Sequence, residues 1–135
     1  MKLALLVCAA WVVLTVSSSG CHDPAANVGL VELNTQTLDA PATIAPGTTL
    51  TVGLNVEVGG CFIFDHIQSQ RTASQVDLTV WGRDIRTGIT DRGILCPRFV
   101  VESHEYQLDP PFQNPFTVVI GRGRISPLIA VVHVQ

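Results

Sequence analysis

The side chains with the clearest capacity for covalent chemistry are the four cysteines, Cys8, Cys21, Cys61 and Cys96. Cys61 and Cys96 each stand where a predicted strand meets a loop, which suits a disulfide. Such a crosslink would stabilise a domain of this size by roughly 3 to 4 kcal/mol. The alternative is a metal site that adds His66 or His104, but neither a Cys-x-x-Cys motif nor a histidine pair at ligand spacing is present. We therefore expect a Cys61–Cys96 disulfide and no bound metal.

The chain begins with a pattern typical of a secretory signal. Lys2 precedes an apolar run from Leu3 to Val16, and small residues fill positions 17 to 20. The run is shorter than the ~20 apolar residues that a transmembrane helix needs. We predict that residues 1–20 are a signal helix and that the mature protein works outside the cytoplasm. The alternatives are an ordinary signal cut after Ser19 or Gly20, and a retained anchor helix.

Export leaves one cysteine that needs a role. Cys8 leaves with the signal, so an odd number of thiols reaches an oxidising compartment, and Cys21 remains once Cys61 pairs with Cys96. Ser18-Ser19-Gly20-Cys21 resembles the lipobox of bacterial lipoproteins, although Ser18 stands where an aliphatic residue is usual.

The lipobox resemblance implies that Cys21 is acylated and that residues 21–27 tether the domain to a membrane. The same resemblance implies a place in the bacterial cell envelope. His22 directly follows the cysteine and Asp23 comes one residue later, so sorting rules that retain lipoproteins with an aspartate in the second position in the inner membrane would not retain this one, which favours the outer membrane. Plain secretion without a lipid is the alternative.

Histidines beside carboxylates are the residues that could serve in acid–base catalysis. Asp65-His66 and His104-Glu105 are such pairs, but neighbouring side chains on a strand point to opposite faces. The serines lack a Gly-x-Ser-x-Gly context, and no glycine-rich phosphate loop is present. We therefore predict that the protein is not an enzyme and uses no cofactor. A small hydrolase or metal-dependent module would instead require His66 and His104 to converge with carboxylates in one pocket.

Two charged segments are the best candidates for binding a partner, because loops on rigid sheets often carry recognition. The residues concerned are Arg83, Asp84, Arg86, Asp91 and Arg92 in segment 83–97, and Arg122 and Arg124 in segment 121–127. The plainer alternative is a solvated loop with local Arg–Asp pairs worth ~0 to 1 kcal/mol each. An inhibitory loop that presents Arg122 and Arg124 to a protease is a further variant.

The charge balance argues against one class of partner. After Gly20 the sequence holds seven arginines against eleven aspartates and glutamates, which is mildly acidic. A nucleic-acid-binding domain needs a basic field, so no nucleic acid is expected.

Strands must position all of these residues. Leu50 to Val58 alternates aliphatic with polar or small side chains, which predicts a strand with one buried face. Five further strands and a weak edge strand are predicted over residues 28–35, 62–72, 76–80, 98–108, 116–120 and 128–134, the fifth of these ending before a turn at 121–124. The last segment is almost wholly aliphatic apart from His133, so it is expected to be either a central strand or covered on both faces.

This spacing predicts a single all-β domain over residues 28–135, an antiparallel β-sandwich of about seven strands. A half-open barrel is the alternative. Ala45-Pro46-Gly47 stands before a strong strand, Gly59-Gly60-Cys61 follows that strand, and Pro110-Pro111 stands before the strand that begins at Phe116. This order of elements is similar to small immunoglobulin-like or fibronectin-like domains of exported bacterial proteins. That resemblance implies a non-catalytic binding or structural module with an envelope protein as its partner.

Overall fold

The computed structural model describes residues 29–86 and 95–135. The predicted signal, Cys21, the tether, Asp91 and Arg92 lie outside these residues. The described part is all-β and holds nine strands rather than the seven expected: β1 (Leu30–Glu32), β2 (Thr35–Asp39), β3 (Thr43–Ile44), β4 (Leu50–Val58), β5 (Phe62–Arg71), β6 (Gln75–Asp84), β7 (Val100–Leu108), β8 (Phe116–Arg122) and β9 (Ile125–Val134). Among these residues no helix is long and apolar enough to cross a membrane.

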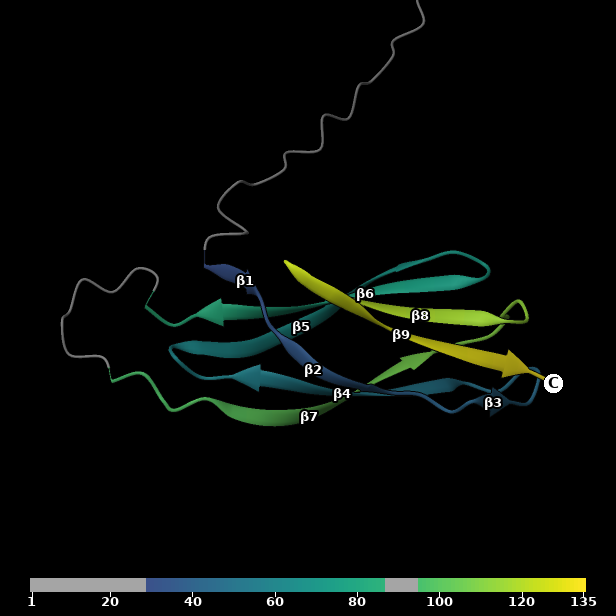
Figure 1. The fold of residues 1–135 in the computed structure, drawn as a ribbon, viewed down its shortest axis with the longest axis horizontal. Helices are drawn as coiled ribbons and strands as arrows, with labels where there is room; N and C mark the ends of the chain where they lie inside the picture. The colour runs from purple at the N-terminus through teal and green to yellow at the C-terminus, as the bar shows by residue number, and fades with distance from the viewer. Residues whose placement is uncertain (1–28, 87–94) are drawn as a thin grey trace, which may run out of the picture.

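The smaller of two sheets has three strands in the order β2-β4-β7, all antiparallel (Figure 1). Its centre, β4, has the bounds that its period of two predicted, and its five aliphatic side chains are buried while the residues between them are partly or fully exposed. Strand β4 lies between the other two: it pairs with β7 over its whole length and with β2 from Gly53 to Val56.

The larger sheet has the order β1-β6-β8-β9-β3, and β5 pairs with β6. Two pairs in it are parallel, β6 with β8 and β3 with β9, so the prediction of a wholly antiparallel sandwich is wrong. The physical reason is a crossover: the chain leaves this sheet after β6, forms β7 in the other sheet, and returns as β8 in the direction of β6. Periodicity reports which face of a strand is buried but carries no information about its neighbour.

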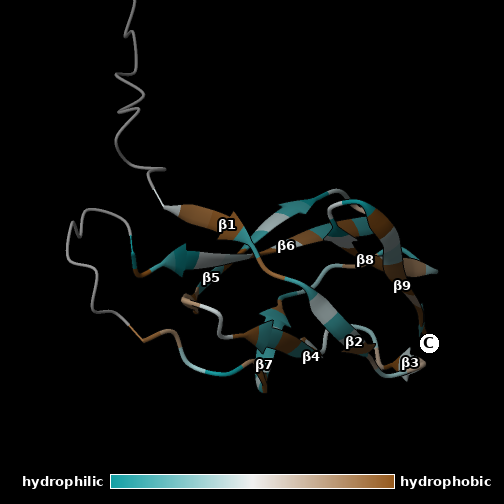
Figure 2. Cartoon of the chain, turned by 60° about the vertical axis from the view of Figure 1, so that its left-hand side comes forward, coloured by the Kyte–Doolittle hydropathy of each residue, from teal (hydrophilic) through white to brown (hydrophobic). Residues whose placement is uncertain are grey.

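The core lies between the two sheets, which face each other as the ribbon shows (Figure 2). The smaller sheet contributes Leu50, Val52, Leu54, Val56, Val58 and Leu108, and the larger sheet contributes Val76, Leu78, Val80, Phe116, Val118, Ile120 and Val132, with Leu33 from the link between β1 and β2. Burial of this continuous apolar layer is the main favourable term in folding.

Strand β9 is more exposed than its aliphatic sequence predicted. Ile129 is 61% and Val131 49% exposed, whereas Val132 is fully buried. The strand has neighbours on both sides in the sheet, but nothing in the described residues covers its outer face. Of the two alternatives predicted for this strand, the central position is confirmed, because β9 lies between β8 and β3, whereas cover on both faces is not found in the described part of the chain.

Strand β6 also extends further than expected, because Trp81 and Gly82 lie inside it rather than at its end. Gly82 pairs with β1 on one side and β5 on the other. An added Cβ there would lie 2.6 Å from Leu33 Cγ, so glycine is needed to leave room for the Leu33 side chain against β6.

The disulfide between Cys61 and Cys96 is present, with the two Cα atoms 4.5 Å apart, as predicted. Cys61 closes a turn after β4 in which Gly59, Gly60 and Cys61 have positive φ angles of 116°, 59° and 76°. Two glycines in sequence make this turn possible because they adopt positive φ without a steric cost. The turn brings Gly60 against the ring of Phe99 in the segment that follows Cys96.

Candidate functional site

The most polar cluster in the described residues is centred on Asp65 in β5. One of its carboxylate oxygens, Oδ2, lies 2.7 Å from His66 Nδ1, and the other, Oδ1, accepts a hydrogen bond of 2.6 Å from Arg83 Nη2. These contacts, His66 first and Arg83 second, hold the pKa of Asp65 below its ordinary value. Asp65 is therefore a stable anion that binds Arg83 of β6 and its own neighbour His66.

The Asp65–His66 contact contradicts the expectation that these neighbours point to opposite faces. The cause is a β-bulge: Phe64 pairs with Gly82 and His66 with Trp81, which leaves Asp65 without a partner of its own in β6. An extra residue in one strand turns its side chain away from strict alternation. A bulge depends on the register between two strands, so no pattern within the segment could have indicated it.

A histidine oriented by a carboxylate is two thirds of a nucleophile-activating triad, and this cluster lacks the third part. Ser69, the serine nearest along β5, instead accepts a hydrogen bond of 2.8 Å from the hydroxyl of Tyr106 in the other sheet. The side chain of His66 is 47% exposed, so water competes for its free nitrogen. The cluster is best understood as an ionic fastening between β5 and β6.

His104 lies in a different environment. Its ring stacks on Phe64 with centroids 3.8 Å apart and an interplanar angle of 18°, and its Nε2 lies 3.3 Å from Glu102 Oε2. His104 pairs with Leu54, whose side chain is in the core, while Glu105 pairs with Gly53 on the outer face, as predicted for this pair.

His66 and His104 therefore lie in different parts of the sandwich. Phe64, at the inner side of β5, lies between the sheets, whereas His66 pairs with Trp81 beyond the bulge. Within residues 29–86 and 95–135 no three histidine, cysteine or acidic side chains come together as a metal site would require. The geometry of the hydrolase or metal-dependent alternative is thus not found in the described part of the chain.

The first predicted binding segment is partly strand. Arg83 and Asp84 are the last residues of β6, and Arg86 follows it. Arg86 binds Asp84 through its Nη2 at 2.7 Å and its Nε and backbone N at 2.9 Å, and these bonds lower the pKa of Asp84. Its guanidinium also lies 5.4 Å from the ring centroid of Phe62.

The second predicted segment forms the β8–β9 hairpin. Arg122 is the last residue of β8, and its Nε donates to the carbonyl oxygen of Ser126 at 2.8 Å. Glu32 of β1 accepts a hydrogen bond of 3.1 Å from Gly123 N, which fastens the hairpin beside β1. Because Leu30 and Val31 of β1 also pair with the end of β6, the two predicted segments lie on either side of β1 at one end of the molecule.

Two shallow hollows lie on the surface beside the link between β1 and β2. One, of about 250 Å³, is lined by Val31, Glu32, Leu33, Asn34, Glu57, Gly59, Phe62 and Phe99. The other, of about 110 Å³, is lined by Glu32, Leu33, Asn34, Arg122, Gly123 and Ile125. The residues 32 to 34 belong to both, so one continuous surface runs from Phe99 to Ile125. The sequence did not indicate this surface, because it is assembled from four separate segments.

No family model, curated protein or solved structure matches this chain. The residues at this end of the molecule therefore have to be interpreted from their own geometry. Among the described residues, that geometry contains ion pairs, an aromatic stack and exposed apolar side chains, and it contains no arrangement that would activate a nucleophile.

Proposed function

We propose that the protein is an exported, lipid-anchored and non-catalytic binding or structural module of the bacterial cell envelope. One observation carries the proposal: the disulfide between Cys61 and Cys96 uses two of the three cysteines that follow the signal-like segment. A structural disulfide suits an oxidising compartment. It also leaves Cys21, directly after Gly20, as the thiol for which acylation supplies a role.

The non-catalytic part of the proposal is supported by how the candidate groups are used. Asp65 and His66 bind each other on an exposed strand, and His104 is stacked against Phe64 between the sheets. A catalytic base must lie within hydrogen-bonding reach of the group that it deprotonates. We therefore assign these residues to the stability of the sandwich.

We also propose that the domain is a variant of the immunoglobulin-like sandwich. Support comes from two facing sheets, a core built by alternating inward side chains, and a disulfide at one end. The parallel β6–β8 pair departs from the antiparallel arrangement of that family. The proposed relation to the immunoglobulin-like family would be contradicted if structures of homologues of this protein placed the strand equivalent to β7 in the larger sheet, between the equivalents of β6 and β8.

The anchor is tested by the mass of the mature N-terminus after expression in a bacterium that processes lipoproteins. We expect a chain that begins at Cys21 and carries acyl groups, and we expect a Cys21→Ser variant to lack them and leave the membrane fraction. A mature N-terminus without acyl groups and with a free Cys21 thiol would instead support plain secretion. A His66→Ala variant serves as the control, because it should be acylated normally.

A further inference from the structure

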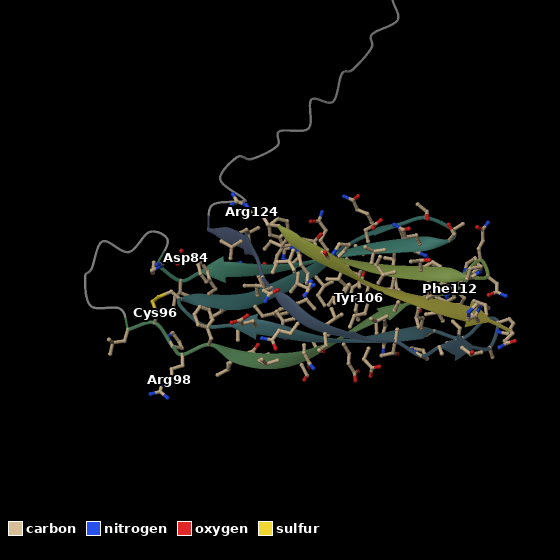
Figure 3. The ribbon with its side chains drawn as sticks, in the orientation of Figure 1. Asp84, Cys96, Arg98, Tyr106, Phe112 and Arg124 are labelled. Atoms are coloured by element: carbon tan, nitrogen blue, oxygen red, sulfur yellow. A yellow bond between two sulfur atoms is a disulfide. The ribbon has the colours of Figure 1, made fainter. Side chains whose placement is uncertain are left out.

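The place where the chain enters the domain is fixed by hydrogen bonds. Gly29 O accepts from Asp84 N at 2.7 Å, and Ile85 N donates to Cys61 O at 3.0 Å, so the first described residue lies beside the disulfide. We call this part of the molecule the entry end and define it as residues 29–34, 57–66, 81–86, 95–101 and 121–126. Figure 3 shows Asp84, Cys96 and Arg98 together at this end and Phe112 at the opposite end.

Large apolar side chains are exposed mainly at the entry end. In the described part of the chain eight such side chains are exposed, and six of them lie here: Ile63, Leu95, Phe99, Val100, Val101 and Ile125. Leu95 is 93% and Phe99 63% exposed. Exposed apolar surface that gathers in one region marks an interaction site, whereas scattered single residues do not.

Positive charge is concentrated in the same region. Of the six arginines in the described residues, only Arg71 lies elsewhere, and the entry end holds Arg83, Arg86, Arg98, Arg122 and Arg124. Its four carboxylates all accept hydrogen bonds within the domain: Glu32 from Gly123, Glu57 from Asn34, Asp65 from Arg83, and Asp84 from Arg86.

The arginines of the entry end fall into two groups. Arg83 and Arg86 are paired with carboxylates, whereas Arg98, Arg122 and Arg124 form no ion pair within residues 29–86 and 95–135. The remainder of the described domain holds Arg71 and five carboxylates. The domain is thus polarised along its length, with unpaired cations and apolar side chains at one end and net negative charge over the rest.

We propose that the entry end lies against an anionic lipid surface, with Leu95, Phe99, Val101 and Ile125 in the headgroup region and Arg98, Arg122 and Arg124 on lipid phosphates. The inference rests on the proposed lipid anchor. Seven residues separate Cys21 from Gly29, and a chain of that length spans at most about 25 Å. An acylated Cys21 therefore keeps the entry end, rather than the acidic remainder, close to the membrane.

The physical chemistry of the surface agrees with this occupant. Arginine and exposed apolar side chains act together at a membrane interface, because the cations are attracted to anionic headgroups while the apolar groups enter the boundary layer. The acidic remainder would be repelled and would point away from the bilayer.

The test measures co-sedimentation of the full chain carrying Cys21→Ser with vesicles of phosphatidylethanolamine and phosphatidylglycerol. We expect binding that weakens with salt and is lost on vesicles of phosphatidylcholine alone. Combining Arg98→Ala, Arg122→Ala and Arg124→Ala should reduce binding at least tenfold, and about 100-fold is the limit expected for three arginines. All variants share the same residues before Gly29, so any contribution from that segment cancels in the comparison.

Two matched controls locate the effect. Thr51→Glu, Gln107→Glu and Gln113→Glu change the net charge by the same amount at the opposite end, and this variant should bind within twofold of the parent. Leu95→Ser with Val101→Ser should weaken binding, whereas Ile129→Ser with Val131→Ser, on the outer face of β9, should not. Far-ultraviolet circular dichroism verifies that each variant is folded.

The outcomes separate this inference from the proposed anchor. Equal losses in the entry-end and control variants, or no binding to anionic vesicles by the Cys21→Ser chain, would overturn the inference even if the mature N-terminus proves to be acylated. Selective loss in the entry-end variants would support it, even if the mass measurement finds no acyl group.

Discussion

Removal of the Cys61–Cys96 disulfide tests whether this crosslink or the apolar core dominates the stability of the domain. The bond joins residues 35 positions apart. In the chain-entropy description a closed loop of that length destabilises the unfolded state by about 4 kcal/mol. The free energy of unfolding of a folded domain is only about 5 to 15 kcal/mol, so the disulfide would contribute a large share of it. We expect Cys61→Ser with Cys96→Ser to lower the melting temperature by about 15 °C.

The assay is urea unfolding followed by circular dichroism, with Cys21→Ser in every chain so that no other thiol is present after the signal. The parent in reducing buffer should match the double variant. A Cys61→Gly, Cys96→Ser chain provides a second comparison, because residue 61 has a φ of 76° that glycine adopts freely. It should recover about 1 kcal/mol relative to serine.

A loss below about 1 kcal/mol, with an unchanged dependence on urea, would refute the reasoning. It would mean that the core alone holds the Gly59-Gly60-Cys61 turn against the segment after Cys96. A loss well above 4 kcal/mol would show instead that the crosslink also maintains contacts in the folded state, such as that between Phe99 and Gly60.

Three further changes test the packing and the ion pairs. Gly82→Ala should lower the free energy of unfolding in urea by about 2 kcal/mol, because the new Cβ would lie 2.6 Å from Leu33. Gly53→Ala is the control: the nearest neighbour of its new Cβ would be 3.6 Å away, so the free energy of unfolding should change by less than about 0.5 kcal/mol. Equal effects of the two substitutions would contradict the close-packing argument. Thr35→Val should raise stability by about 1 kcal/mol, because the Thr35 hydroxyl is buried and has no hydrogen-bond partner among the described residues; a destabilised variant would show that the hydroxyl is satisfied. Asp65→Asn should be less stable than the parent at neutral pH. A folded-state pKa below the ordinary aspartate value of 3.8 gives the parent stability that is lost as the pH falls through that lowered pKa, so the melting temperatures of the two proteins should converge on acidification below pH 3.8. A difference in melting temperature that does not depend on pH would contradict the ionic role.

Strands whose two faces differ could be predicted from the sequence. Leu50 to Val58 has the same bounds in the structure, because one buried and one solvated face leave a strict period of two. The Cys61–Cys96 disulfide is also confirmed, since both residues stand at the ends of predicted elements. For the strand the evidence lay in the alternation within one segment, and for the disulfide it lay in the small number of cysteines and their positions beside predicted strands.

The features that sequence reasoning missed depend on the contacts between segments. The parallel β6–β8 pair follows from which sheet receives β7, and the bulge at Asp65 follows from register with Trp81 and Gly82. The exposure of Ile129 depends on whether a third layer covers β9, which an aliphatic sequence cannot indicate. The continuous surface from Phe99 to Ile125 likewise depends on contacts among four segments that are separate in the sequence.

The opposite end of the sandwich shows why the entry end is the better candidate for external contact. There the guanidinium of Arg71 donates hydrogen bonds to the backbone oxygens of Asp109 and Pro111 and lies 4.7 Å from the ring centroid of Phe112. Its only described cation is thus used to fasten the domain's own chain.

At the entry end the Cys61–Cys96 disulfide holds neighbouring segments of the chain together. Because Cys61 and Cys96 tie the turn after β4 to the segment that precedes β7, that segment does not depend on Arg98 for attachment. Arg98 and Arg124 can then face outward beside Phe99 and Ile125 without loss to the fold. A disulfide placed beside the point of chain entry therefore supplies the rigidity that a surface held against a membrane would need.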